Sequence, residues 1–119
     1  NINRRFTNGL DFAPHADFFM LKAAYEASQK HGGCIVGGVS SMDYFYDETD
    51  SAKKLQAHGV LAVEMEASAL YSIAARKKRR ALAILTVSDH VFTHESMESD
   101  ARDRSLNNMV EIGLAALNA

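Results

Sequence analysis

The sequence predicts an α/β domain in which a mixed, largely parallel sheet is flanked by helices. Two observations carry this prediction. Short apolar runs alternate along the chain with stretches whose apolar residues recur at helical spacing, which is typical of βαβ units. The run 81–87 is made only of apolar or β-branched residues and does not alternate with polar ones, as expected of a strand covered on both faces.

The composition fits one globular domain. The chain has 119 residues, of which 47% are hydrophobic and 24% charged. A formal net charge of −2 gives no reason to expect nucleic acid or a membrane surface as a partner. No apolar stretch approaches the ~20 residues of a membrane span. Cys34 is the only cysteine, so an internal disulfide is excluded and a reducing, cytoplasmic compartment is expected.

Two helices and a strand are expected in the first half of the chain, after an irregular start at 1–14. Asp17 can cap the first helix, and Gly32-Gly33 ends it. The apolar stripe of this helix consists of Phe18, Leu21, Tyr25 and Ser28. Residues 34–36 then read as a short buried strand, and residues 51–58 as a polar helix.

Two strands and two helices are expected in the second half. The strands are 60–63 and 81–87, of which the latter has the stronger pattern. The first helix has a stripe of Ala67, Leu70, Tyr71, Ala74 and Ala75. The second begins near Ser99, with a stripe of Leu106, Met109, Val110, Gly113 and Leu117. Arg102 precedes this stripe by one turn, so we expect it to point toward the body of the protein.

Two carboxylates, Glu64 and Glu66, stand where the strand 60–63 meets the next helix. If the strand continues to residue 66, alternation places both on one side. Paired carboxylates there are suitable acceptors for a vicinal diol such as that of a ribose. Alternatively, Glu66 merely favours the positive N-terminus of the helix and Glu64 is solvated. Spacing alone leaves both interpretations open.

A second polar group, Ser88-Asp89-His90, follows the run 81–87. Its aspartate could be a general acid, a hydrogen-bond acceptor for a base, or the first residue of a turn. His90 and His94 are four residues apart, but no third ligand stands out, so we expect no metal site.

Phe45 and the basic run 76–80 are weaker candidates. Phe45 lies between two tyrosines and could stack on a flat ring, although such clusters are more often part of a core. The run 76–80 could contact phosphates. Cations are favourable at a helix C-terminus in any case, so we interpret it as a solvated helix end.

Several stretches together resemble the bacterial hexameric type of purine nucleoside phosphorylase, in the nucleoside phosphorylase superfamily. They are Asn3–Phe6, Ala16–Phe18, Asp43–Tyr46, Gly59–Ala67 and Leu85–His90. The string Val63–Ala67 is shared across the superfamily, whereas Thr86–His90 followed by Arg102 narrows the resemblance to purine enzymes. The resemblance implies a phosphorylase/hydrolase-like fold, of which residues 1–119 would form the C-terminal half of a single domain.

For the sugar and the base, the resemblance implies five site residues. Glu66 would accept hydrogen bonds from the ribose hydroxyls, assisted by Glu64 and by Met65 packing on the sugar. Phe45 and Val63 would line the purine pocket.

For the chemistry, the resemblance implies three more residues. Ser88 and Asp89 would face N7 and the 6-substituent of the purine. Asp89 would donate a proton to N7 while phosphate attacks C1′, which makes the base a neutral leaving group. Arg102 would help to position Asp89 as the final helix closes.

The implied reaction is the reversible phosphorolysis of purine (deoxy)ribonucleosides to free base and (deoxy)ribose 1-phosphate. Inorganic phosphate would be the co-substrate, no cofactor would be needed, and the protein would be a homo-oligomer, a hexamer by resemblance. The family's phosphate-binding arginines and glycine-rich loop have no counterpart here, so we expect an incomplete enzyme that is inactive by itself. The family also has a glycine after the helix that precedes the last strand, where this chain has Lys78–Arg80.

The alternatives are a catalytically silent nucleoside-binding or oligomer-forming fragment, and another member of the superfamily, either a nucleosidase or a uridine phosphorylase. Ser88-Asp89-His90 with Arg102 argues against the uridine enzyme.

Overall fold

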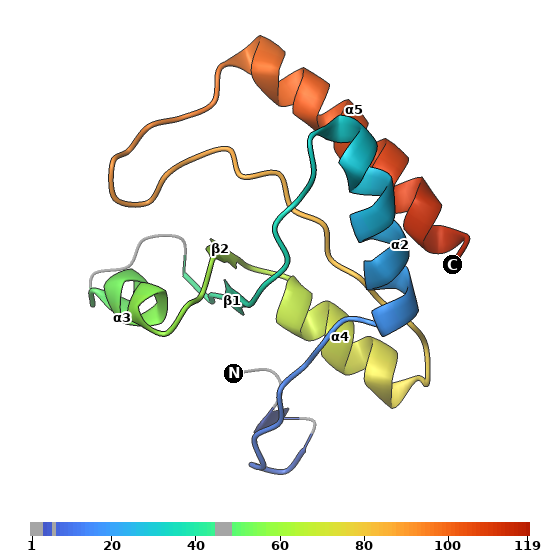
Figure 1. Ribbon diagram of the computed structural model, residues 1–119. Helices are drawn as coiled ribbons and strands as arrows, with labels where there is room; N and C mark the ends of the chain where they lie inside the picture. The colour runs from blue at the N-terminus through green and yellow to red at the C-terminus, as the bar shows by residue number, and fades with distance from the viewer. Residues whose placement is uncertain (1–3, 6, 45–48) are drawn as a thin grey trace. The chain divides into compact units, whose positions relative to one another are not determined.

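The chain forms a mixed α/β structure, seen in a computed structural model that describes residues 4–5, 7–44 and 49–119 (Figure 1). The elements are α2 (Phe18–Ser28), η1 (Gln29–His31), β1 (Val39–Ser41), α3 (Ser51–Ala57), β2 (Ala62–Glu64), α4 (Ala67–Arg76) and α5 (Ser99–Leu117). They belong to two compact units. The sheet unit comprises Asn1–Ala16 and Gly37–Ala81, and the helical unit comprises Asp17–Val36 and Leu82–Ala119.

The sheet unit is built around the parallel pair β1 and β2, joined through α3. In the register of this pair, Val39 lies opposite Ala62 and Ser41 opposite Glu64. The Met42 amide donates to the Glu64 carbonyl at 2.7 Å, which extends the pairing to the carboxyl ends of both strands. A parallel pair with a helical crossover confirms the predicted βαβ arrangement.

The strand predicted at 34–36 is wrong, because pairing begins later in the chain. Ile35 is 86% exposed, and no ladder partner for 34–36 occurs in the described part of the chain. Hydrogen bonding starts where the Leu61 amide donates to the Gly38 carbonyl at 2.9 Å. Gly37 admits the Leu61 side chain here, since a Cβ at this position would clash with Leu61 Cδ1. The paired segment is therefore Val39–Ser41, which contains two serines, and not the apolar segment 34–36.

The strand predicted at 81–87 is also wrong within the described residues. The segment has no assigned strand in the described part of the chain. Just beyond it, Asp89 forms an isolated antiparallel bridge with Ser96. Leu82 and Ile84 pack on the core of the helical unit, whereas Val87 is 62% exposed. One side of the segment is therefore covered and the other is open, because α5 packs on one side only.

The first predicted helix is confirmed by α2 and its end signals. The Asp17 carboxylate accepts a hydrogen bond from the Met20 amide at 3.0 Å and caps the helix N-terminus. Gly32 follows η1 with a left-handed φ of 92°. The predicted stripe is wrong in part, since Phe18 is 67% exposed and the buried residues are Ala24 and Ser28.

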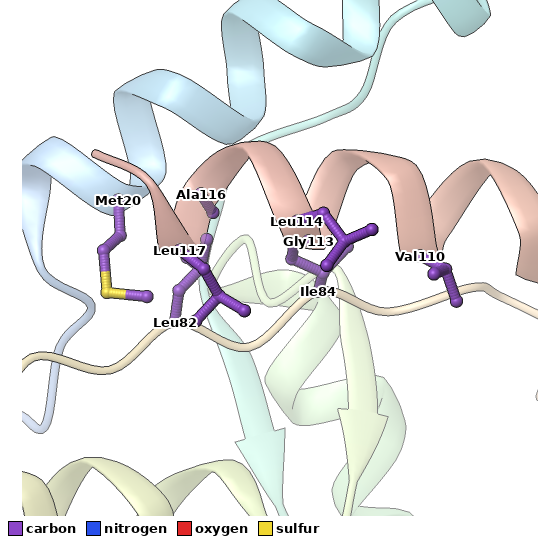
Figure 2. A pocket seen from close by; sticks show the side chains of 8 residues that line it. All are labelled: Met20, Leu82, Ile84, Val110, Gly113, Leu114, Ala116 and Leu117. Carbon is purple, nitrogen blue, oxygen red and sulfur yellow. The ribbon is translucent and has the colours of Figure 1, made fainter.

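The core of the helical unit lies between α2 and α5, which run side by side in Figure 1. Ala24, Ile112 and Ala116 form its buried centre. Of the predicted α5 stripe, Leu106, Val110 and Leu117 lie outside this centre and are 40%, 56% and 68% exposed. Figure 2 shows the open apolar groove beside this core; its lining residues are Met20, Leu82, Ile84, Val110, Gly113, Leu114, Ala116 and Leu117.

The ends of α3 and α4 follow one pattern. After α3, the Val60 amide donates to the Leu55 carbonyl at 3.1 Å, and Gly59 takes a left-handed φ of 79°. After α4, the same left-handed position is filled by Lys78, with a φ of 52°. Both ends are Schellman motifs, and a lysine takes the place where glycine is the usual residue.

Helices capable of crossing a membrane are not found in the part of the chain that the structure describes.

Candidate functional site

The turn between β2 and α4 is organised by the carboxylate of Glu64. Its Oε2 accepts hydrogen bonds from the Glu66 amide at 2.7 Å and the Ala67 amide at 2.6 Å. Its Oε1 accepts a hydrogen bond from the Ser41 hydroxyl. These amides belong to the N-cap residue and to the first residue of α4, where no helical carbonyl is available to them and a negative charge is favourable.

Ser41 joins three elements at this point. It lies opposite Glu64 in the parallel register, at the carboxyl end of β1. Its hydroxyl donates to Glu64 and accepts a hydrogen bond from the Ser68 amide of α4 at 2.8 Å. This residue was not among the predicted site residues, because the strand was expected at 34–36. The signal was the adjacent ends of two parallel strands, one carrying a hydroxyl and the other a carboxylate.

The pKa of Glu64 lies below its ordinary value of 4.5. Burial is the largest single influence and raises the pKa. The hydrogen bonds from Ser41 and from the amides of Ala67, Glu66 and Met65 together outweigh it. Glu64 is therefore a carboxylate at neutral pH, and its negative charge is part of the turn.

Glu66 differs from Glu64 in that its carboxylate is exposed. No hydrogen bond or ion pair engages this carboxylate among the residues that the structure describes. The neighbouring Val63 and Met65 side chains are 38% and 44% exposed. The turn thus presents one unengaged acceptor group beside two partly open apolar side chains.

These positions correct the expectation that strand alternation places both glutamates on one side. The strand ends at Glu64, and Glu66 has φ −127° and ψ −28°, which is not a strand conformation. The alternative interpretation is corrected for Glu64, which is not merely solvated but accepts hydrogen bonds from the amides at the helix N-terminus. Glu66 is the N-cap residue and makes no side-chain capping bond.

In the helical unit, Ser88 and Asp89 belong to a short hairpin. Asp89 pairs with Ser96 in the antiparallel bridge, and the Met97 amide donates to the Ser88 carbonyl at 2.7 Å. The Ser88 hydroxyl donates to Asp89 Oδ2 at 2.5 Å. This contact orients the exposed carboxylate, and no hydrogen bond to Asp89 Oδ1 is found among the described residues.

Arg102 reaches this hairpin from the second turn of α5. Its guanidinium Nη2 donates to the Met97 carbonyl at 3.3 Å, and Met97 in turn is bonded to Ser88. Arg102 is exposed, so the expectation that it points toward the body of the protein is wrong. No ion pair joins it to Asp89 within the described ranges, and the link between the two residues runs through the hairpin backbone.

The other candidates are placed as follows. The His90 Nδ1 accepts hydrogen bonds from the amides of Phe92 and Thr93, at 3.3 and 3.1 Å, which makes it a turn residue. Across 4–5, 7–44 and 49–119, no cluster of three potential metal ligands is found. Phe45 lies outside the described residues. The basic run 76–80 is exposed throughout.

Comparison with known proteins assigns the chain to a family. Residues 7–118 match the family described as the phosphorylase superfamily. The chain therefore belongs to the phosphorylase superfamily, in agreement with its mixed α/β fold.

Several individual proteins are similar to this chain over nearly its whole length. A purine nucleoside phosphorylase DeoD-type from a Jannaschia species is 54% identical over 109 residues, which are 90% of this chain and 47% of that protein. Proteins of the same name from Listeria welshimeri and Bacillus cytotoxicus are 48% and 51% identical over 97% and 98% of this chain, and over 50% of their own length. The chain thus spans about half the length of the curated relatives that it matches.

Proposed function

We propose that the protein to which this chain belongs is a purine nucleoside phosphorylase. It would cleave purine (deoxy)ribonucleosides with inorganic phosphate, reversibly, to the free base and (deoxy)ribose 1-phosphate. The observation that carries this proposal is the identity of about half of all residues to relatives of that name, over nearly the whole chain. The exposed polar groups of the two units supply chemistry suited to the reaction.

The sheet unit would bind the sugar. The unengaged Glu66 carboxylate is an acceptor for the ribose hydroxyls, and Met65 offers an apolar surface to the sugar ring. Val63 would face the base together with Phe45. Glu64 would assist by holding the turn, because its oxygens already accept hydrogen bonds from Ser41 and from the amides of Glu66 and Ala67.

The helical unit would act on the base. Asp89 would carry a proton on Oδ1 and transfer it to N7 of the purine as the bond to C1′ breaks. Protonation matters because an anionic purine separates poorly from a sugar that develops positive charge. Ser88 orients Asp89 through the 2.5 Å hydrogen bond, and Arg102 supports the hairpin through Met97.

Phosphate attacks C1′ from the face opposite the base. We place the groups that bind it in the part of the relatives' length that this chain does not span. Phosphate is thus the co-substrate, and no cofactor is required. We further propose that the protein is a homo-oligomer, which is a hexamer by resemblance. We also propose that it is cytoplasmic and that it acts in purine salvage.

Release of hypoxanthine from inosine tests this function in the protein that contains the chain. Phosphorolysis predicts that hypoxanthine appears only with phosphate and that ribose 1-phosphate appears in equal amount. Equal rates without phosphate would identify a nucleosidase, and preference for uridine would identify the pyrimidine enzyme. The span of only half of the relatives favours a second candidate, a nucleoside-binding or oligomer-forming polypeptide. Inosine binding without turnover would support that candidate.

A further inference from the structure

The hydrogen bonds of Ser41 link the proposed sugar site to the other strand of the sheet. The hydroxyl donates to Glu64 Oε1 and accepts from the Ser68 amide, so both of its functions are used. Glu64 passes this restraint to the amides of Glu66 and Ala67. The conformation of the turn at Glu66 therefore depends on a side chain that lies more than twenty residues earlier in the sequence.

A capping role for Glu64 alone would not require Ser41. A carboxylate near a helix N-terminus is satisfied by the amides of the first turn and by water. The serine adds a charge-assisted bond and fixes Glu64 Oε1 relative to β1, so that the helix start and the strand end move as one body. Such a fixed turn is what a site needs to hold a carboxylate toward two adjacent hydroxyls.

We propose that Ser41 is a positioning residue for sugar recognition, which acts through Glu64 to fix the turn that presents Met65 and Glu66. This role rests on the proposed phosphorylase function. Ser41 does not touch the substrate in this account. Its contribution is to the binding of the ribose hydroxyls, and not to the binding of phosphate.

Steady-state kinetics of the full-length protein test this role with three variants. Ser41→Ala removes the hydroxyl and should raise the KM for inosine about tenfold, the usual loss for a hydrogen bond to a charged group. Ser41→Thr keeps the hydroxyl on a residue that suits a strand, and should keep the KM within about threefold of the wild type. Ser40→Ala is the matched control, since Ser40 is the adjacent serine of the same strand and projects to the other face.

Two further readouts separate positioning from a general loss of structure. The KM for phosphate should not change in Ser41→Ala. The KM for 2′-deoxyinosine should rise less than that for inosine, because this substrate lacks one of the hydroxyls that Glu66 would hold. If Ser41→Ala does not fold, Ser41→Thr and Ser41→Cys decide, and a tenfold higher KM for inosine is expected only in the cysteine variant, whose thiol is a weak donor.

The outcomes distinguish the two levels of the proposal. A wild-type protein without phosphate-dependent release of hypoxanthine overturns the proposed function and this role with it. An active wild type in which Ser41→Ala matches Ser40→Ala overturns the role of Ser41 alone. Equal increases in KM for inosine, 2′-deoxyinosine and phosphate also overturn it, because they would show a structural role without selectivity for the sugar.

Discussion

The segments 60–67 and 81–90 are both apolar runs that end in an acidic group, but their surroundings differ. In the first, β2 is paired with β1, and Glu64 is bonded to two amides and to Ser41. In the second, Leu82 and Ile84 pack on the helical core, and no strand pairs with 81–87 in the described part of the chain. The hairpin that follows pairs Asp89 with Ser96 in an antiparallel bridge.

The difference shows that a carboxylate can be fixed in two ways. Glu64 accepts hydrogen bonds from β1, through Ser41, and from the start of α4, through the amides of Glu66 and Ala67. These bonds also restrain the neighbouring residue Glu66. Asp89 is held by one side-chain bond from Ser88 and by a local hairpin. We therefore expect the first segment to be ordered by its own contacts, and the second to depend more on whatever covers its open side.

The largest expected effect concerns the acid of the second segment. Asp89→Asn keeps the size of the side chain but cannot transfer a proton, so turnover of adenosine should fall about 10²- to 10⁴-fold. Inosine should lose less, because its 6-oxo purine is stabilised as an anion by an amide that bonds to N7 and O6. A 7-methylated nucleoside already carries the positive charge and should be cleaved almost as well as by the wild type.

The control is Asp103→Asn, at an exposed aspartate of α5, which should leave all three rates unchanged. Equal losses with the three substrates in Asp89→Asn would mean that Asp89 holds the hairpin and is not the acid.

A smaller effect is expected for the acceptor of the first segment. Glu66→Ala should lower kcat/KM for inosine about 10- to 150-fold, the equivalent of about 1.5–3 kcal/mol for a hydrogen bond to a charged group. Arg79→Ala, in the exposed basic run, should have little effect in the same assay. A larger loss of kcat/KM in Arg79→Ala than in Glu66→Ala would show that the sugar site does not lie at Glu66.

The turn itself should weaken in acid because of Glu64. Its pKa is lower in the folded protein, so its contribution to stability is complete above the ordinary value of 4.5 and is lost as the pH falls through the folded value. Glu64→Gln should reduce the free energy of unfolding by about 1 kcal/mol at neutral pH. Denaturant titrations should show this difference shrinking below pH 4.5.

An equivalent change in the hairpin that follows the second segment provides the comparison. Glu95→Gln, at an exposed position of the hairpin, should alter the free energy of unfolding less at neutral pH. A pH-independent loss in Glu64→Gln would show that shape, and not charge, makes Glu64 important.

The smallest effect is expected where the chain leaves α4 toward the second segment. Lys78→Gly removes the cost of a left-handed φ of 52° and should raise the free energy of unfolding by about 1 kcal/mol. Lys77→Gly removes the same charge at a residue with φ −89°, so it should not raise the free energy of unfolding. Thermal unfolding of both variants measures the difference. A gain in both variants would trace the effect to repulsion among the basic side chains.

The sequence predicted the order of elements better than the pairing of strands. A capping residue located the start of α2, and helical spacing located α4 and α5, because these signals are local. Strand pairing is not local, and the apolar runs 34–36 and 81–87 carried no information about which neighbour was available. The polar triplet Val39–Ser41 was passed over, although its register with Ala62–Glu64 forms the sheet.

The candidate site was predicted in its residue types more than in its geometry. Resemblance pointed to the segment at Glu66 and to that at Asp89. It could not show that Glu64 is engaged by Ser41 and two amides, since that depends on a contact between two strands. The prediction for Arg102 failed for a related reason, because helical spacing gives a direction but not the hairpin backbone that receives the guanidinium.

Hydrogen exchange of individual amides tests the central claim most directly, namely that the segment 60–67 is ordered by hydrogen bonds to its own turn and strand, whereas the stretch at Leu85 and Val87 is not. The amides of Ala67 and Ser68, which donate to Glu64 and Ser41, should be protected. Those of Leu85 and Val87 should exchange faster. Protection of Leu85 and Val87 equal to that of Ala67 and Ser68 would contradict the account, since it would require a strand partner for the second segment.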